Sequence, residues 1–227
     1  MTTPAPRFTV HPSAREPGDG IWFAVPAGFC EVNVDSLVAP EGASGVEDTA
    51  DALASAVSAA PDDFVREAFV AQLARAQEMF RALRSKGTSH CSLGLHSDDS
   101  GGGKQLPLLS LFTVTWVDAV WAPRRITVGR AVANTEGQSN IEYMELGCGP
   151  VTFSEVLRTP SLGSELASSP LLQLHAHFAH PDGRTLVLLT LSTTALDHCE
   201  SYRAILRQIV ATAGFESPLA QVPIRAS

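Results

Sequence analysis

Residues 171–193, LLQLHAHFAHPDGRTLVLLTLST, decide the fold class of this chain. They contain two apolar segments, Leu171–Ala179 and Arg184–Thr193, which we interpret as β-strands. Pro181-Asp182-Gly183 lies between the segments and is a turn signal, because proline fixes φ and glycine tolerates a positive φ. We therefore predict a β-hairpin.

An amphipathic helix is predicted directly after this hairpin. Its apolar residues recur at helical spacing and are Leu196, Cys199, Tyr202, Ile205, Leu206, Ile209, Val210 and Ala213. One stripe of the helix must be buried, and the most economical place is the face of the hairpin.

Composition excludes several classes of protein. The 227 residues are 44% hydrophobic and 18% charged, which is typical of a globular chain with a sizeable core. A formal net charge of −8 argues against binding to nucleic acid or an anionic membrane, because those surfaces attract clustered Lys and Arg. Arg124, Arg125 and Arg130 come nearest to a cluster, and we interpret them as a solvated strand end.

Neither a secretory signal nor a membrane span is expected. The first seven residues lack a basic segment followed by an apolar run, and nowhere do about eighteen apolar residues run together. We therefore predict a cytoplasmic protein. In that reducing compartment the four cysteines are interpreted as small buried hydrophobic residues: Cys30, Cys91, Cys148 and Cys199.

The N-terminal half is predicted to contain a hairpin and a helical region. A short edge strand is possible at Arg7–His11, and Gly20–Val25 and Phe29–Val34 look like two strands of the first hairpin. Helical spacing runs from Glu47 to Lys86, with a division at Pro61 and a stop at Gly87, where glycine commonly ends helices.

The C-terminal half is predicted to be mostly strands. The candidates begin at His90 and continue with Leu106–Val120, Arg125–Ala133, Ile141–Cys148 and Val151–Leu157, and Gly147–Pro150 is the turn between the last two. Helices grouped apart from a mainly antiparallel sheet make an α+β fold. We expect an arm at 1–19, one domain at 20–215 and a tail at 216–227.

The beginning and the end of the predicted domain resemble the PsbP-like α/β sandwich. GIWFAVPAGF at residues 20–29 is similar to the opening strand and turn of that group, and LVLLTLST at 186–193 leads into a similar last helix. The group includes the photosynthetic PsbP proteins, the mycobacterial LpqN lipoproteins and the Eag chaperones of type VI secretion effectors. Most members of this group are not enzymes and act by binding other proteins, so the resemblance implies a protein-binding role.

The best candidate for chemistry is a set of three histidines. His175 and His177 alternate on one strand, so their side chains leave the same face about 6–7 Å apart, near enough to share a metal ion, and His180 could join from the turn. No Asp, Glu or Cys at a regular offset completes a ligand set. The alternative is ordinary strand histidines on a polar face.

Other chemical motifs are incomplete. There is no G-x-S-x-G nucleophile motif, and Gly101–Gln105 lacks the Ser or Thr and the following helix that a phosphate loop requires. Glu142, Glu145 and Glu155 are isolated on predicted strands and are expected to face water. The acidic residues between Glu41 and Asp63 are expected to stabilise the N-terminal ends of helices through the helix dipole. Alternatively, they form an acidic surface that attracts a basic partner.

The leading hypothesis is a non-catalytic protein-binding module without a cofactor. It would act as an adaptor, a secretion-type chaperone or an immunity-like inhibitor, and it would present a sheet face or groove to a basic or apolar polypeptide surface. This hypothesis expects no buried cluster of titratable groups. The alternatives are a metal-dependent or small-molecule enzyme using His175 and His177, and a structural subunit of a larger assembly; the oligomeric state stays open.

Overall fold

The computed structural model of the chain describes residues 8–10, 20–26, 28–31, 82–96, 108–159 and 170–216. Its centre is a seven-stranded sheet in the order β3-β4-β5-β9-β8-β7-β6, and every neighbouring pair is antiparallel. The strands are β3 (Phe29–Glu31), β4 (Thr88–His96), β5 (Leu108–Asp118), β6 (Ser139–Leu146), β7 (Gly149–Arg158), β8 (Leu171–Ala179) and β9 (Thr185–Thr193). The predicted α+β class is confirmed.

The hairpin of β8 and β9 forms as predicted. Gly183 has φ +70° in the turn, and the carboxylate of Asp182 accepts hydrogen bonds from the N–H groups of Arg184 at 2.8 Å and Thr185 at 3.0 Å. These bonds lower the pKa of Asp182 to about 2, with the Arg184 N–H as the largest cause. The hairpin supplies β9, the central strand of the sheet, and β8, which is contacted by a helix on each face of the sheet.

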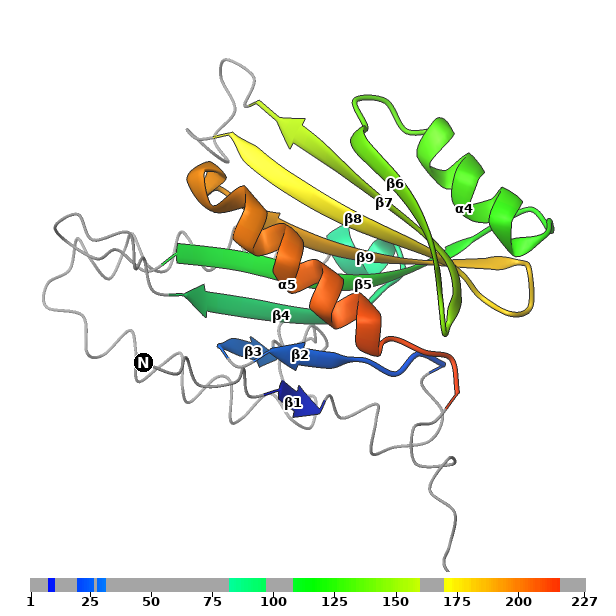
Figure 1. Cartoon of the computed structure of the whole chain (residues 1–227), viewed down its shortest axis with the longest axis horizontal. Helices are drawn as coiled ribbons and strands as arrows, with labels where there is room; N and C mark the ends of the chain where they lie inside the picture. Colours follow the sequence, from blue (N-terminus) through cyan, green and yellow to red (C-terminus); the bar gives the residue numbers. More distant parts are fainter. Residues whose placement is uncertain are drawn as a thin grey trace, which may run out of the picture.

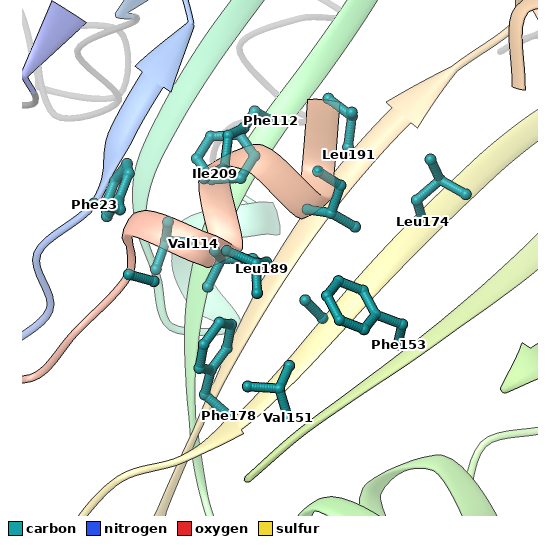
Figure 2. Close-up of a cluster of buried hydrophobic side chains, with 14 of the residues drawn as sticks. Phe23, Phe112, Val114, Val151, Phe153, Leu174, Phe178, Leu189, Leu191 and Ile209 are labelled. Carbon is teal, nitrogen blue, oxygen red and sulfur yellow. The ribbon is translucent and has the colours of Figure 1, made fainter. Parts of the chain in front are cut away.

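Helix α5 (Cys199–Thr212) covers one face of the sheet, which we call the α5 face (Figure 1). The short 3₁₀ helix η2 (Leu196–His198) precedes it. All eight apolar residues of the predicted stripe belong to the main core or pack against it. Figure 2 shows Ile209 lying over Phe112, Val114, Leu189 and Leu191 of the two strands beneath.

Helix α4 (Arg124–Ala133) covers β7 and β8 on the opposite face, which we call the α4 face. Its buried residues are Thr127, Val128 and Val132. The strand predicted at 125–133 is therefore wrong. Val128 and Val132 are one helical turn apart, so burial of this stripe outweighs the strand preference of the β-branched residues.

The predicted N-terminal hairpin is also wrong. The strand β2 (Ala24–Pro26) pairs with β1 (Phe8–Val10) in a separate two-stranded sheet, whereas β3 pairs with β4 in the large sheet. The edge strand predicted at Arg7–His11 is confirmed as β1. Just before β2, Trp22 exchanges two backbone hydrogen bonds of 2.8 Å with Gly214, which joins this segment to the end of α5.

The remaining predictions lie partly outside the described residues. Of the helical region predicted at 47–86, residues 82–85 are helical and Gly87 follows with φ +88° as the predicted stop. Pro61, the acidic residues from Glu41 to Asp63, the loop at 101–105 and residues 161–169 fall outside the described part. The helices of the described part include none with the length and apolar character needed to cross a membrane.

Candidate functional site

His175 and His177 lie on the α4 face of β8 as the alternation predicts. Their ring centroids are 5.9 Å apart. His175 Nδ1 is 3.0 Å from Thr190 Oγ1 on β9, and His177 Nε2 is 3.1 Å from Ser154 Oγ on β7. Each ring is therefore held by a hydroxyl of a neighbouring strand.

Both imidazoles are buried, and burial keeps them uncharged near neutral pH. Desolvation lowers the pKa of His175 to about 4, with a smaller contribution from Arg158, and lowers the pKa of His177 to about 3, with a smaller contribution from His175. The hypothesis of a binding module expected no buried cluster of titratable groups. These two histidines form a buried pair, which that hypothesis did not predict.

One nitrogen of this pair has no hydrogen-bond partner. His177 is 4% exposed, and neither its Nδ1 nor the Oγ1 of Thr152, the residue opposite it on β7, is hydrogen-bonded. Ser154 and His177 resemble the first two members of a nucleophile–base arrangement, but no carboxylate orients the free Nδ1. An unpaired Nδ1 on a buried neutral imidazole is suited to a hydrogen bond with water, or to a metal ion in the tautomer that carries its proton on Nε2.

His180 lies apart from the other two histidines. Its Nδ1 is 3.0 Å from a carboxylate oxygen of Asp182, and its ring packs edge-on against Phe215, with centroids 4.9 Å apart, and Trp116. No group of three or more His, Cys, Asp or Glu side chains in metal-binding proximity occurs among the described residues. The metal site stays a prediction.

The glutamates of β6 and β7 are paired with arginines of α5 or α4. Glu155 was expected to face water, but it is 8% exposed and accepts two hydrogen bonds from Arg203, at 2.9 Å from Nε and 2.8 Å from Nη2. Arg207, one helical turn further, pairs with Glu142, and its guanidinium carbon lies 4.9 Å from the ring centre of Phe153. Neither arginine was identified from the sequence; their spacing of four residues places them on one side of a helix but does not identify their glutamate partners.

A pocket of ≈ 270 Å³ opens between α5 and the strands β6, β7 and β8. Its apolar part is formed by Phe153, Leu174 and Leu206. Its polar part is formed by the two arginine–glutamate pairs, Asn140, Ser154 and His175. Because each charge in the pocket already has a partner of opposite sign, the pairs serve first to fasten α5 to the sheet edge.

Arg124 fastens α4 in a similar way. Its Nε donates to the carbonyl of Ala179 at 2.8 Å, and its Nη2 donates to the carbonyl of Cys148. The guanidinium carbon lies 5.8 Å from the ring centre of Phe215. The interpretation of Arg124 as part of a solvated strand end is therefore wrong, because the side chain links α4 to the ends of β6, β7 and β8.

The cysteines agree with the prediction only in part. Cys91 is buried, and desolvation raises the pKa of its thiol to about 12, as expected for a small apolar residue. Cys148 and Cys199 are half-buried free thiols, and the side chain of Cys30 is outside the described part.

The open edge of β6 was not anticipated from the sequence. The strand is the last of the sheet, so within the described part of the chain its backbone pairs on one side only. Ile141 is 59% and Tyr143 47% exposed on this edge. The apolar residues from Ile141 to Leu146 predict a strand, but they contain no signal for the position of that strand in the sheet.

The register of β6 and β7 identifies the free backbone groups. Leu146 is opposite Gly149, and Glu145 is opposite Pro150. Proline has no N–H, so Glu145 and Pro150 cannot exchange two hydrogen bonds, and the doubly bonded pairs must be those of Leu146, Met144 and Glu142. The backbone N–H and C=O groups of Tyr143 and Glu145 therefore point away from β7, toward the open edge.

The charges along this edge are neutralised within the chain. Hydrogen bonds from Arg207 lower the pKa of Glu142, and hydrogen bonds from Tyr143 and then Arg125 lower the pKa of Glu145. Tyr143 Oη and Arg125 Nε each lie 2.6 Å from Glu145 Oε1. A strand arriving at β6 thus meets ion pairs and apolar side chains, with no bare carboxylate.

A second exposed apolar segment lies between β5 and α4. Val120 and Trp121 are 84% and 66% exposed, and the Trp121 indole lies over Gly183 of the β8–β9 turn. Exposed tryptophans often anchor protein contacts, but this one stands beside polar turn residues.

Comparison with known proteins found no match at any level. The chain matched no family model, and the searches of curated proteins and of solved structures returned no match.

Proposed function

We propose that this chain is a non-catalytic protein-binding module that receives an extended segment of a polypeptide as an added strand on the edge of β6. The observation that carries the proposal is the row of outward backbone groups at Tyr143 and Glu145, on a strand that has one neighbour among the described strands. Backbone hydrogen bonds supply affinity in strand addition, and side chains at alternate positions supply specificity.

The exposed side chains define the class of polypeptide. Tyr143 and Ile141 project at alternate positions of β6, and aromatic residues pair best with β-branched or aromatic residues on the adjacent strand. Since Arg125 and Arg207 already neutralise the two glutamates, the apolar partner expected from the sequence is favoured over the basic one.

The biological role is a further part of the proposal. A cytoplasmic adaptor, a secretion-type chaperone and an immunity-like inhibitor would each use an edge that accepts an extended segment. The resemblance to PsbP-like proteins, whose members mostly bind other proteins, points the same way and stays a prediction.

A proline substitution tests the proposal. Tyr143→Pro removes one outward N–H and leaves the ladder with β7 intact, because proline is tolerated on edge strands when its missing N–H faces solvent. Random peptides displayed on phage and selected on the wild-type chain should bind Tyr143→Pro at least tenfold more weakly. Tyr143→Phe, which keeps the backbone, is the control and should retain binding. Equal binding to all three chains would refute strand addition.

The second candidate is a metal-dependent enzyme at His175 and His177. It is favoured by the unpaired Nδ1 of His177 next to a second imidazole. Stoichiometric zinc in the purified protein, lost in His177→Ala and kept in His198→Ala, would support it. A metal-free wild-type chain after exposure to zinc would reject it.

A further inference from the structure

The strand β6 lacks two of the features that commonly protect sheet edges. Residues 139–146 contain neither proline nor lysine, which commonly block pairing at an edge. A bulge and the positive φ of Asn140 (46°) disturb only the beginning of the strand. The opposite edge of the sheet is β3, which has only three residues. The two edges therefore differ, and β6 is the one that can pair over a long segment.

We propose that the strand received by β6 is β6 of a second copy of this chain, antiparallel and with Tyr143 opposite Tyr143. The proposal rests on the proposed function, because it names the polypeptide that the same edge accepts. The two sheets would join into one, with both α5 helices on one face and both α4 helices on the other.

The charges of β6 are compatible with this pairing and disfavour two others. With Tyr143 at the centre, Glu142 stands opposite Met144, and Glu145 opposite Ile141, so no glutamate faces a glutamate. If the residue opposite its own copy, which we call the centre, were Glu142 or Glu145, two identical carboxylates would face each other, which is unfavourable. Arg207 and Arg125 of each copy remain beside their own glutamates.

Backbone geometry selects the same centre. Outward groups must meet outward groups, and Tyr143 has both its N–H and C=O directed to the open edge. With Met144 at the centre the glutamates also stay apart, but the central pair would then be two residues whose backbone groups are bonded to β7, whereas with Tyr143 at the centre it is two residues whose backbone groups point outward. A centre at Ile141 would place Asn140 beside the central pair, where its positive φ interrupts the ladder, whereas with Tyr143 at the centre Asn140 lies at the end of the paired segment.

The first test is the mass of the full chain in solution. A single strand pair is a small interface, so we expect dissociation in the range of about 1–100 µM. Light scattering across that range should show the mass of 24.1 kDa rising toward twice this value. A constant single-chain mass up to about 1 mM would overturn the inference.

Disulfide trapping tests the register. Paired residues in an antiparallel ladder have Cα atoms about 5.5 Å apart, within disulfide reach, so Tyr143→Cys should cross-link with itself under mild oxidation. Ile141→Cys is the control, because its two copies would be about 13 Å apart along the strands. We expect at least tenfold more cross-linked dimer from Tyr143→Cys, above the background of the native cysteines. Equal or greater cross-linking of Ile141→Cys would overturn the register.

The outcomes separate the two proposals. If the chain is monomeric while the phage-selected peptides still depend on the Tyr143 backbone, self-pairing is wrong and strand addition stands. If the chain is dimeric and Tyr143→Pro, shown to be folded by its circular dichroism, remains equally dimeric, the dimer uses another surface and self-pairing at β6 is refuted.

Discussion

His175 and His177 make stability depend on pH at the scale of single residues. Both titrate near 6.5 in the unfolded chain, whereas burial lowers the pKa to about 4 and about 3 in the folded one. Between pH 6.5 and about 4 the unfolded state binds more protons. The free energy of unfolding is therefore highest above pH 6.5 and falls as pH decreases, by at most about 1.4 kcal/mol per pH unit for each histidine.

Urea unfolding at pH 7.5, 6 and 5 measures this effect. Asn at 175 preserves the position of Nδ1 toward Thr190, and Gln at 177 preserves that of Nε2 toward Ser154, yet neither titrates. The double variant His175→Asn, His177→Gln should therefore lose much less stability on acidification than the wild type. Parallel pH profiles would contradict the assignment.

Glu155 and Glu142 form a matched pair of residues. Both accept from an arginine of α5, but the side chain of Glu155 is 11% exposed and that of Glu142 is 45% exposed. Glu155→Ala should lower the free energy of unfolding by about 2–3 kcal/mol, because it leaves the charge of Arg203 without its carboxylate partner next to a buried strand. Glu142→Ala should lower it by less than about 1 kcal/mol. Equal losses in urea unfolding would show that burial does not distinguish the pairs.

The burial of Glu155 could not be predicted from its strand. A carboxylate at one position of an alternating segment is compatible with water on either face, and the partner Arg203 lies 48 residues later on another element. The histidine pair was predictable because both residues belong to one strand, where alternation alone sets their spacing.

At the scale of elements, local signals predicted the β8–β9 hairpin and α5. The Pro-Asp-Gly turn and the apolar spacing after Leu196 are contained in short segments. Helix α4 was missed for the opposite reason. Ile126, Thr127, Val128 and Val132 favour strands locally, and the helix depends on burial against β7 and β8 and on the hydrogen bonds of Arg124 with distant carbonyls.

Substitutions at two glycines, Gly87 before β4 and Gly129 inside α4, test the local backbone structure. Gly87 has φ +88°, and an added Cβ would lie 2.3 Å from the backbone oxygen of Trp116, so Gly87→Ala should destabilise by about 2 kcal/mol or more. Gly129 is inside α4 with nothing within 4 Å of an added Cβ. Gly129→Ala should therefore stabilise by about 0.5–1 kcal/mol. Thermal unfolding would show both shifts, and a loss of stability in Gly129→Ala would contradict a helix there.

Arg124 and Arg125 provide a second comparison between elements. Arg124 donates to carbonyls at the ends of two other strands or turns, while Arg125 is 75% exposed in its ion pair with Glu145. Arg124→Ala should cost about 1.5–3 kcal/mol, and Arg125→Ala should change stability by less than about 0.5 kcal/mol. Denaturant unfolding of both variants is the measurement, and similar values would show that Arg124 does not fasten α4.

At the scale of the whole molecule, the α+β class was predictable and the strand order was not. Alternation identifies strands one by one, but pairing joins residues far apart, as when β3 bypasses β2 and pairs with β4. The position of β6 at the edge follows from that order, so the candidate binding surface could be found only in the structure.

The central claim is that the outward amides of β6 are free to receive a strand. Amide hydrogen exchange, followed residue by residue by NMR, tests it most directly. In dilute protein Tyr143 and Glu145 should exchange rapidly while Met144, bonded to β7, is protected, and raising the concentration or adding a selected peptide should protect Tyr143 and Glu145 as well. Exchange at these two amides that is slow in dilute protein, or that stays rapid when a partner binds, would contradict the account.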